Sequence, residues 1–133
     1  MIAFDTNALV RMLVEDDANQ AKIVRDIVTL VEGQEGRILI LSEVLMETVW
    51  VLESVYHCER EEIHRFLETL LQTPTFTSDD HAAIGPAVSQ YRRGGDFADL
   101  VIVSRAKCLQ AKRMISFDKK LQKKFPDYIF ASL

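Results

Sequence analysis

The first seven residues, Met1-Ile2-Ala3-Phe4-Asp5-Thr6-Asn7, decide the fold class. Their apolar run ends in a carboxylate, and a helical pattern follows at once. This order predicts a buried strand that delivers Asp5 to the edge of a sheet. In open α/β sheets, ligands bind at the carboxyl ends of the strands. A catalytic site built on Asp5 would therefore draw its other carboxylates from the same edge.

Strand patterns alternate with helical patterns along the rest of the chain. The run Ile38-Leu39-Ile40-Leu41 is typical of a parallel strand covered on both faces, and short strands are predicted over 75–77, 114–116 and 128–130. Helices are predicted over 8–14, 17–32, 42–55, 60–72, 80–93 and 96–112, with a last helix starting at Asp118. This alternation predicts an α/β fold, a parallel β-sheet flanked by α-helices on both faces, as a single domain over residues 1–133.

Three local signals refine these elements. Asp17 followed by Gln20 resembles a capping box at the start of the second helix, and Ser42 is predicted to cap the third. Gly85-Pro86 lies inside the fifth helical stretch and predicts a kink or a restart, because proline removes a helix hydrogen bond and clashes with the preceding turn.

The length and the amino-acid composition indicate an ordinary globular protein. The chain has 133 residues, of which 48% are hydrophobic and 27% charged. No apolar run approaches the roughly 18–20 residues of a membrane span, and the N-terminus lacks the pattern of a secretory signal. Cys58 and Cys108 lack the spacing of a metal knuckle and are predicted to be reduced, buried thiols. These features predict a cytoplasmic protein with no membrane partner.

The distribution of charge is compatible with a nucleic-acid partner. The net charge of −4 argues against one, but basic residues cluster at 92–93, 112–113 and 119–124. Such patches could meet phosphates, whose contacts supply much of the affinity for nucleic acids. Solvated helix faces are the simpler interpretation of most of the lysines. Arg11, Arg92 and Arg93 are the candidate RNA contacts.

Three later aspartates occupy positions that suit catalysis. Asp118 lies just past the predicted strand 114–116, and so at a strand's carboxyl end. Asp96 and Asp99 lie three residues apart in the first turn of a helix, and therefore on one face. Asp96 can equally be a helix cap, because acids are favoured at that end of a helix. Asp99 is one turn deeper, and capping explains it less well.

Glu47 is predicted to emerge from a buried helix face. Its neighbours three and four positions away include Val44, Trp50 and Val51. Burying a carboxylate without a partner costs several kcal/mol, so Glu47 would need a cation, strong hydrogen bonds or an interior salt bridge. Glu43, one turn earlier, is predicted to be solvated.

A convergence of these acids would need a counter-charge. Two carboxylates about 4 Å apart repel by roughly 4 kcal/mol at an effective dielectric constant near 20. Protons or a divalent cation would offset that repulsion, and ligation by oxygen alone suits Mg²⁺ or Mn²⁺ rather than zinc. A cation held in this way, with positions open for water and phosphate, supports phosphodiester hydrolysis.

Four motifs in order resemble the PIN-domain family, and more closely its VapC-type toxin branch. They are Asp5-Thr6-Asn7 after a strand, the helical stretch 44–52 around Glu47, Asp96-Phe97-Ala98-Asp99, and Ser116-Phe117-Asp118. Together they cover nearly the whole chain. The resemblance implies a small Mg²⁺- or Mn²⁺-dependent ribonuclease, the toxin of a type II toxin–antitoxin pair, with its acidic site at the strand ends.

The resemblance also assigns roles to residues. It makes Asp5, Glu47, Asp99 and Asp118 the catalytic, metal-binding acids and Asp96 an accessory acid. The small polar residues that would support the ligands or the attacking water are Thr6, Asn7 and Ser116; Ser116 stands where threonine is commoner and keeps the hydroxyl. Proteins of this type usually form homodimers and are held inactive by a small antitoxin whose C-terminal segment occupies the site groove.

Other functions fit the sequence less well. A phosphatase of the haloacid-dehalogenase type needs a second acid two residues after Asp5, where this chain has Asn7. A receiver-like domain would need its acidic pair near the first strand, whereas Asp96, Asp99 and Asp118 all come late. A PIN-like RNA-processing nuclease without an antitoxin and a non-catalytic RNA-binding domain stay open as alternatives.

Overall fold

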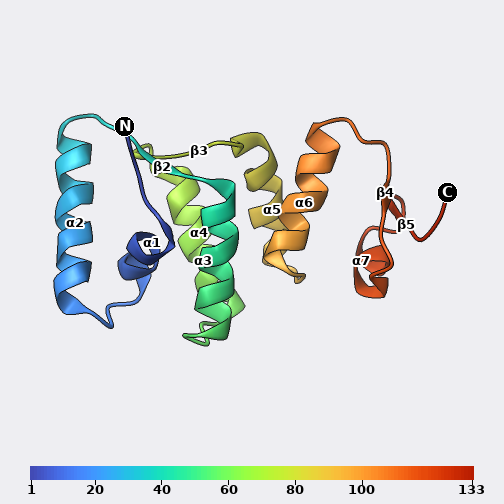
Figure 1. Cartoon of the computed structure of the whole chain (residues 1–133), viewed down its shortest axis with the longest axis horizontal. Coiled ribbons are helices and arrows are strands. Elements are labelled where there is room, and N and C mark those ends of the chain that lie inside the picture. Colours follow the sequence, from blue (N-terminus) through green and yellow to red (C-terminus); the bar gives the residue numbers. More distant parts are fainter. The chain divides into compact units, whose positions relative to one another are not determined.

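The computed structural model describes all 133 residues and contains seven helices and five strands. These elements divide between two compact units, Met1–His81 and Ala82–Leu133, and each unit is described by itself. All the strand pairs are parallel and strands alternate with helices (Figure 1). The predicted α/β class is therefore confirmed. That the whole chain acts as one domain stays a prediction.

The sheet of the first unit has the order β1-β2-β3. Its strands are β1 (Ile2–Ala3), β2 (Ile38–Ile40) and β3 (Phe76–Ser78). Ile38, in the central strand, pairs with Ile2 on one side and Phe76 on the other, and its side chain is fully buried. The prediction that β1 is buried is wrong, because β1 is an edge strand of this sheet and both of its residues are exposed. Only Phe4, just after it, is buried.

Four helices complete the first unit: α1 (Thr6–Leu13), α2 (Ala18–Gly33), α3 (Ser42–Ser54) and α4 (Arg60–Gln72). Helix α1 contacts both α2 and α3. The fully buried side chains Leu9, Leu52 and Ile63 belong to the core, and each contributes about 1.5–3 kcal/mol by its burial. Half of the predicted capping box is present: an Asp17 carboxylate oxygen accepts from the Gln20 N–H at 3.0 Å, while the Gln20 side-chain oxygen accepts from Arg11.

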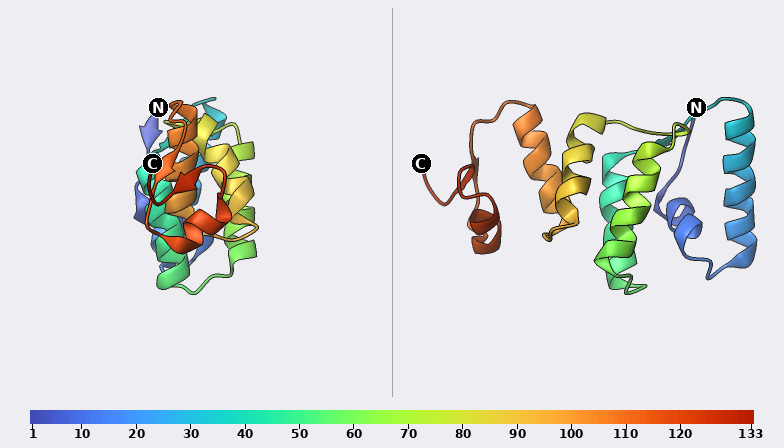
Figure 2. Two further views of the ribbon diagram at one scale, coloured as in Figure 1. Left: turned by 90° about the vertical axis from the view of Figure 1, so that its right-hand side faces the viewer. Right: turned by 180° about the vertical axis from the view of Figure 1, so that it is seen from behind.

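The second unit contains α5 (His81–Tyr91, beginning one residue before the boundary), α6 (Phe97–Cys108), β4 (Met114–Ile115), α7 (Lys119–Lys124) and β5 (Ile129–Phe130). Helices α5 and α6 lie side by side in the views of Figures 1 and 2, and the buried Ser104 hydroxyl donates to the Ala83 carbonyl at 2.7 Å. Strands β4 and β5 form their own parallel pair. Helix α5 continues through Pro86, so the helix does not restart there. Helix α6 ends at Cys108, earlier than predicted, and Gln110 follows with a φ of 69°.

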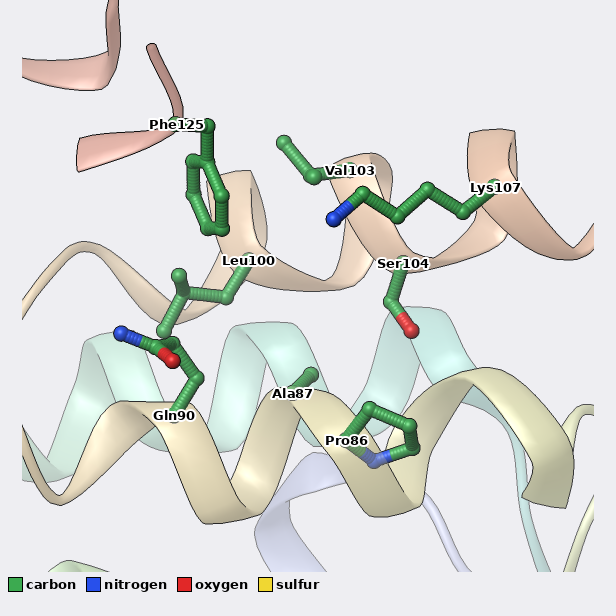
Figure 3. Close-up of a pocket in the computed structure, with 8 residues that line it drawn as sticks. All are labelled: Pro86, Ala87, Gln90, Leu100, Val103, Ser104, Lys107 and Phe125. Carbon is green, nitrogen blue, oxygen red and sulfur yellow. The ribbon is translucent and has the colours of Figure 1, made fainter. Parts of the chain in front are cut away.

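A small, mostly apolar pocket lies between α5 and α6 (Figure 3). Its volume is about 140 Å³, and Phe125, just after α7, lines it together with Leu100 and Val103 of α6. The Lys107 side chain lies along α6 at the same pocket, with its ammonium 5.2 Å from the centre of the Phe125 ring. This contact fixes the end of α7 against α6.

Both cysteines are free thiols, but neither is buried as predicted. Cys58 is partly exposed and Cys108 is exposed. Burial, and then the nearby Glu62, raise the pKa of Cys58, so this thiol stays protonated at neutral pH. None of the helices combines the length and the apolar character needed to cross a bilayer.

Candidate active site

Asp5 stands where the sequence predicts, directly after β1 at the carboxyl edge of the sheet. It is the N-cap of α1, and its Oδ1 atom accepts a hydrogen bond from the Ala8 N–H at 3.0 Å. The residue is exposed, and no hydrogen bond to Oδ2 is formed. The cap therefore fixes the carboxylate while leaving one oxygen available to a ligand.

The other two strands of this sheet also deliver polar side chains to the same edge. Ser42 follows β2 and Asp79 follows β3. The Asp79 Oδ1 atom accepts from the Ser42 N–H at 2.8 Å and from the Ser42 hydroxyl at 2.7 Å. Burial alone would raise the pKa of Asp79, but these hydrogen bonds outweigh it and lower the pKa, so the carboxylate stays ionised.

This pair corrects the prediction that Ser42 caps α3. Ser42 is the first residue of the helix, Leu41 is the N-cap, and the acceptor for the helix N-terminus is Asp79. Sequence reasoning missed Asp79, although Asp79 follows a strand just as Asp5 does. That position after a predicted strand was the signal that could have identified it.

Glu47 lies on α3 and is exposed, so the predicted buried position is wrong. The buried stripe of α3 is instead formed by Ser42, Leu45, Thr48, Val49 and Leu52. Trp50, one of the apolar neighbours that suggested burial, is itself 60% exposed. Glu47 therefore needs no partner inside the protein, and its carboxylate is free to bind a ligand at the surface.

Two of the later acids cap helices. Asp96 is the N-cap of α6, and its Oδ2 atom accepts from the Asp99 N–H at 3.0 Å. Asp118 is the N-cap of α7, and its Oδ1 atom accepts from the N–H groups of Lys120 at 2.9 Å and Leu121 at 3.1 Å. Each cap occupies one carboxylate oxygen, so a cap and a ligand are compatible roles for the same residue.

Asp99 is the most perturbed acid of the second unit. Burial first, and then the negative charges of Asp96 and Asp118, raise the pKa of its carboxyl group. No basic side chain is among the groups that shift it. The second unit thus places three acids at the starts of α6 and α7, and two of them disfavour the ionised form of the third. A partly desolvated carboxylate in such a field gains from a bound proton or metal ion.

Of the smaller polar residues, Ser116 forms hydrogen bonds beside one of the acids. The Ser116 hydroxyl accepts from the Asp118 N–H at 3.1 Å, and the Ser116 carbonyl accepts from the Gln122 side chain at 2.6 Å. Ser116 therefore fixes the turn that carries Asp118. In the first unit, Thr6 is buried at the start of α1 and Asn7 is exposed beside it.

The three candidate phosphate contacts differ in availability. The Arg11 side chain is 17% exposed; its guanidinium pairs with Asp16 at 3.0 Å and donates to Gln20 at 2.9 Å. Arg11 thus ties α1 to the segment that enters α2, which does not support its predicted role as a phosphate contact. Arg92 and Arg93 are exposed after α5.

The predicted set of four acids draws on both units. Asp5 and Glu47 belong to the first, and Asp99 and Asp118 to the second. No group of three or more His, Cys, Asp or Glu side chains is close enough together in this structure to bind a metal ion. The donors nevertheless have the right chemistry, because carboxylate oxygens are the ligands that Mg²⁺ and Mn²⁺ prefer. The assignment of these four residues stays a prediction.

Comparison with known proteins assigns the chain to a family. The profile of the PIN domain matches residues 2–125, a range that includes every acid described above. A VapC ribonuclease of Aquifex aeolicus (strain VF5) is 32% identical over 93 residues, which cover 68% of this chain and 69% of that protein. No solved structure matches the chain significantly.

Proposed function

The chain belongs to the PIN-domain family, and from that premise we propose that it is a metal-dependent endoribonuclease that hydrolyses phosphodiester bonds. The observation that carries the proposal is the placement of Asp96, Asp99 and Asp118 at the starts of α6 and α7, where burial and the charges of the other two acids raise the pKa of Asp99. A divalent ion bound by these carboxylates would offset their mutual repulsion.

The proposed roles follow from the oxygens that the folded chain leaves available. Asp5, Glu47, Asp99 and Asp118 would hold Mg²⁺, or Mn²⁺, through carboxylate oxygens. Such an ion activates water and offsets the charge that develops on the phosphate. The caps on α1 and α7 fix Asp5 and Asp118 through one oxygen each. The supporting residues would be Asp96 at the start of α6, Ser116 in the turn before Asp118, and Thr6 and Asn7 beside Asp5.

A cleavage assay tests these roles. The purified protein is incubated with Mg²⁺ or Mn²⁺ and a panel of structured RNAs, and wild type is compared with Asp5→Asn, Asp99→Asn and the control Asp127→Asn. Asp127 is an exposed acid outside the proposed set. We expect the first two variants to lose at least about a hundredfold in rate, or about 2.7 kcal/mol of transition-state stabilisation, and the control to lose nothing. Equal activity in all four proteins would refute the assignment, and binding without cleavage by wild type would favour the RNA-binding alternative.

We further propose that the protein is the toxin of a type II toxin–antitoxin pair. The similarity to a VapC ribonuclease supports this, as does a hollow of about 330 Å³ between α1 and α2. Asn7 and Arg11 line the hollow from α1, and Ile23, which is 58% exposed, lines it from α2. An apolar side chain of an antitoxin peptide would fit against Ile23, close to the helix that Asp5 caps.

Co-expression with the product of a short neighbouring reading frame tests this partner. That product should bind the protein and suppress cleavage. Ile23→Lys should weaken the suppression while the free enzyme remains active, whereas Thr29→Lys, an exposed substitution elsewhere on α2, should leave it intact. A neighbouring product that neither binds nor inhibits would favour an RNA-processing nuclease without an antitoxin.

A homodimer is the proposed assembly. Trp50 on α3 is a large apolar side chain left 60% exposed, and aromatic residues of this kind are enriched at protein interfaces. Light scattering should give twice the mass of the chain for wild type and a shift towards monomer for Trp50→Ser. An unchanged dimer in that variant would place the interface elsewhere.

A further inference from the structure

The basic residues of the second unit differ in what their charges contact. The Lys107 ammonium lies over the rings of Phe125 and Tyr128, at 5.2 and 4.9 Å from their centres, and the Arg113 guanidinium lies 5.5 Å from the centre of the Phe130 ring. These contacts are cation–π interactions that hold the C-terminal segment. The Lys124 ammonium contacts no ring and forms no hydrogen bond or ion pair. Its charge is therefore not used within the protein.

The Lys124 side chain is nevertheless held in place. Its end lies over the backbone of Gly94 and Gly95, so that a Cβ atom at Gly95 would be 3.1 Å from the lysine Cε and one at Gly94 would be 3.6 Å from Nζ. Both glycines have a positive φ, 118° and 102°, which residues with side chains adopt at a cost. The two glycines thus form a seat without side chains, against which the half-buried lysine packs.

This seat joins the two elements that carry the acids of the second unit. Gly95 directly precedes Asp96, the N-cap of the helix that contains Asp99. Lys124 is the last residue of α7, whose N-cap is Asp118. The exposed pair Arg92 and Arg93 comes just before the glycines in the chain. The ammonium of Lys124 therefore lies on the loop that leads into α6, and two exposed arginines precede that loop in the chain.

We propose that Lys124, seated on Gly94-Gly95, binds the phosphate backbone of single-stranded RNA and positions it at the entrance to α6. This inference rests on the proposed ribonuclease function. Acids repel a polyanion, so a nuclease with a net charge of −4 needs local cations to hold its substrate near its carboxylates. An ammonium with three free donors is suited to phosphate oxygens. Lys124 is a positioning residue, and Arg92 and Arg93 extend the same track.

The test measures RNA affinity separately from cleavage. A fluorescent single-stranded oligonucleotide is titrated in Mg²⁺ buffer with full-length proteins that all carry Asp99→Asn, which is expected to prevent cutting. Lys124→Ala should raise the Kd about five- to tenfold and reduce the slope of log K against log salt by about 0.7, the value for one phosphate contact with a single strand. Lys124→Arg should restore both quantities, and Lys123→Ala, an exposed lysine next to it without a glycine seat, should change neither.

A second variant tests the seat itself. Gly95→Ala keeps every charge, but its Cβ atom would lie 3.1 Å from the lysine Cε and make that side chain shift. It should raise the Kd by less than Lys124→Ala does, with folding checked by circular dichroism. If Lys124→Ala behaves like Lys123→Ala, or if no RNA binds at all, the inference is wrong. Cleavage by the unmutated protein is measured in a separate assay. A failure of the nuclease proposal therefore appears as no cleavage, whereas a failure of the Lys124 inference appears as an unchanged Kd for Lys124→Ala.

Discussion

Three aspartates of the candidate site each hold the first turn of a helix with one carboxylate oxygen: Asp5, Asp96 and Asp118. From sequence, a helix cap and a metal ligand were competing explanations for Asp96. The structure removes the conflict, because a cap leaves the second oxygen available. The cap also limits the rotation of the carboxylate, which lowers the entropy lost when a cation binds. Capping and metal binding are therefore compatible roles for these residues.

Substitutions at Asp118 should separate the two properties. Asparagine caps nearly as well as aspartate, so Asp118→Asn should change the free energy of unfolding by less than about 0.5 kcal/mol, whereas Asp118→Ala should cost about 1 kcal/mol. Both should lower RNA cleavage at least about a hundredfold. Chemical denaturation and initial rates measure the two effects. Asp17, which caps α2 outside the site, is the control, and Asp17→Ala should lose stability but keep its activity.

At the scale of elements, a pair of charge-assisted hydrogen bonds joins the end of β3 to the start of α3, the helix that carries Glu47. The Asp79 carboxylate accepts both Ser42 hydrogen bonds, and its pKa in the folded protein is lowered. A lowered pKa stabilises the fold at every pH above the ordinary value, and the stabilisation is lost as the pH falls through the folded value. The anchoring of α3 should therefore weaken in acid.

Asp79→Asn tests this dependence on pH. At neutral pH the variant should be less stable than wild type, because the charge-assisted hydrogen bonds become weaker neutral ones. The difference should shrink as the pH falls below about 4, the ordinary pKa of an aspartate. Urea denaturation at a series of pH values measures it, with Asp127→Asn as the control. A difference that stays constant with pH would show that the Asp79 charge plays no part.

The helices show which structural features the sequence patterns predict and which they do not. Helix α4 was predicted well because its apolar residues lie on one face, which leaves only one way to turn the helix toward the core. The start of α2 was predicted well because Asp17 caps it. Helix α3 has apolar residues on opposite sides, with the exposed Trp50 on one side and the buried Leu45 and Leu52 on the other. Spacing alone could not choose the buried side, and this is why Glu47 was misplaced. The Asp79–Ser42 contact joins residues 37 positions apart, and only the register of the strands brings them together.

At the scale of the whole molecule, the candidate acids were identified by their order along the chain. The positions of Asp5 and Asp118 after strands follow from local patterns, and the structure agrees with both. Composition and periodicity do not encode which of these acids act together, so that part of the assignment stays a prediction. The net charge of −4 was likewise a poor guide, because it averages local patches of opposite sign.

Metal binding should stabilise the whole molecule. A cation that binds only the folded chain raises the free energy of unfolding by about 2.7 kcal/mol at a hundred times its Kd. Thermal melts with increasing Mg²⁺ should therefore show a rising Tm that EDTA reverses, and Asp99→Asn should remove most of the shift. Asp127→Asn should behave as wild type. A Tm that does not respond to Mg²⁺ or Mn²⁺ would contradict the proposed metal site.

Asp5 and Asp99 are proposed to contribute to the same metal-dependent step of RNA cleavage. Single-turnover cleavage rates of wild type, Asp5→Asn, Asp99→Asn and the double variant test this proposal most directly. Residues that act as a unit have non-additive effects. We predict that each single variant loses at least about a hundredfold in rate and that the double variant is no slower than the slower single one. Losses that multiply in the double variant, or single variants as fast as wild type, would contradict the account.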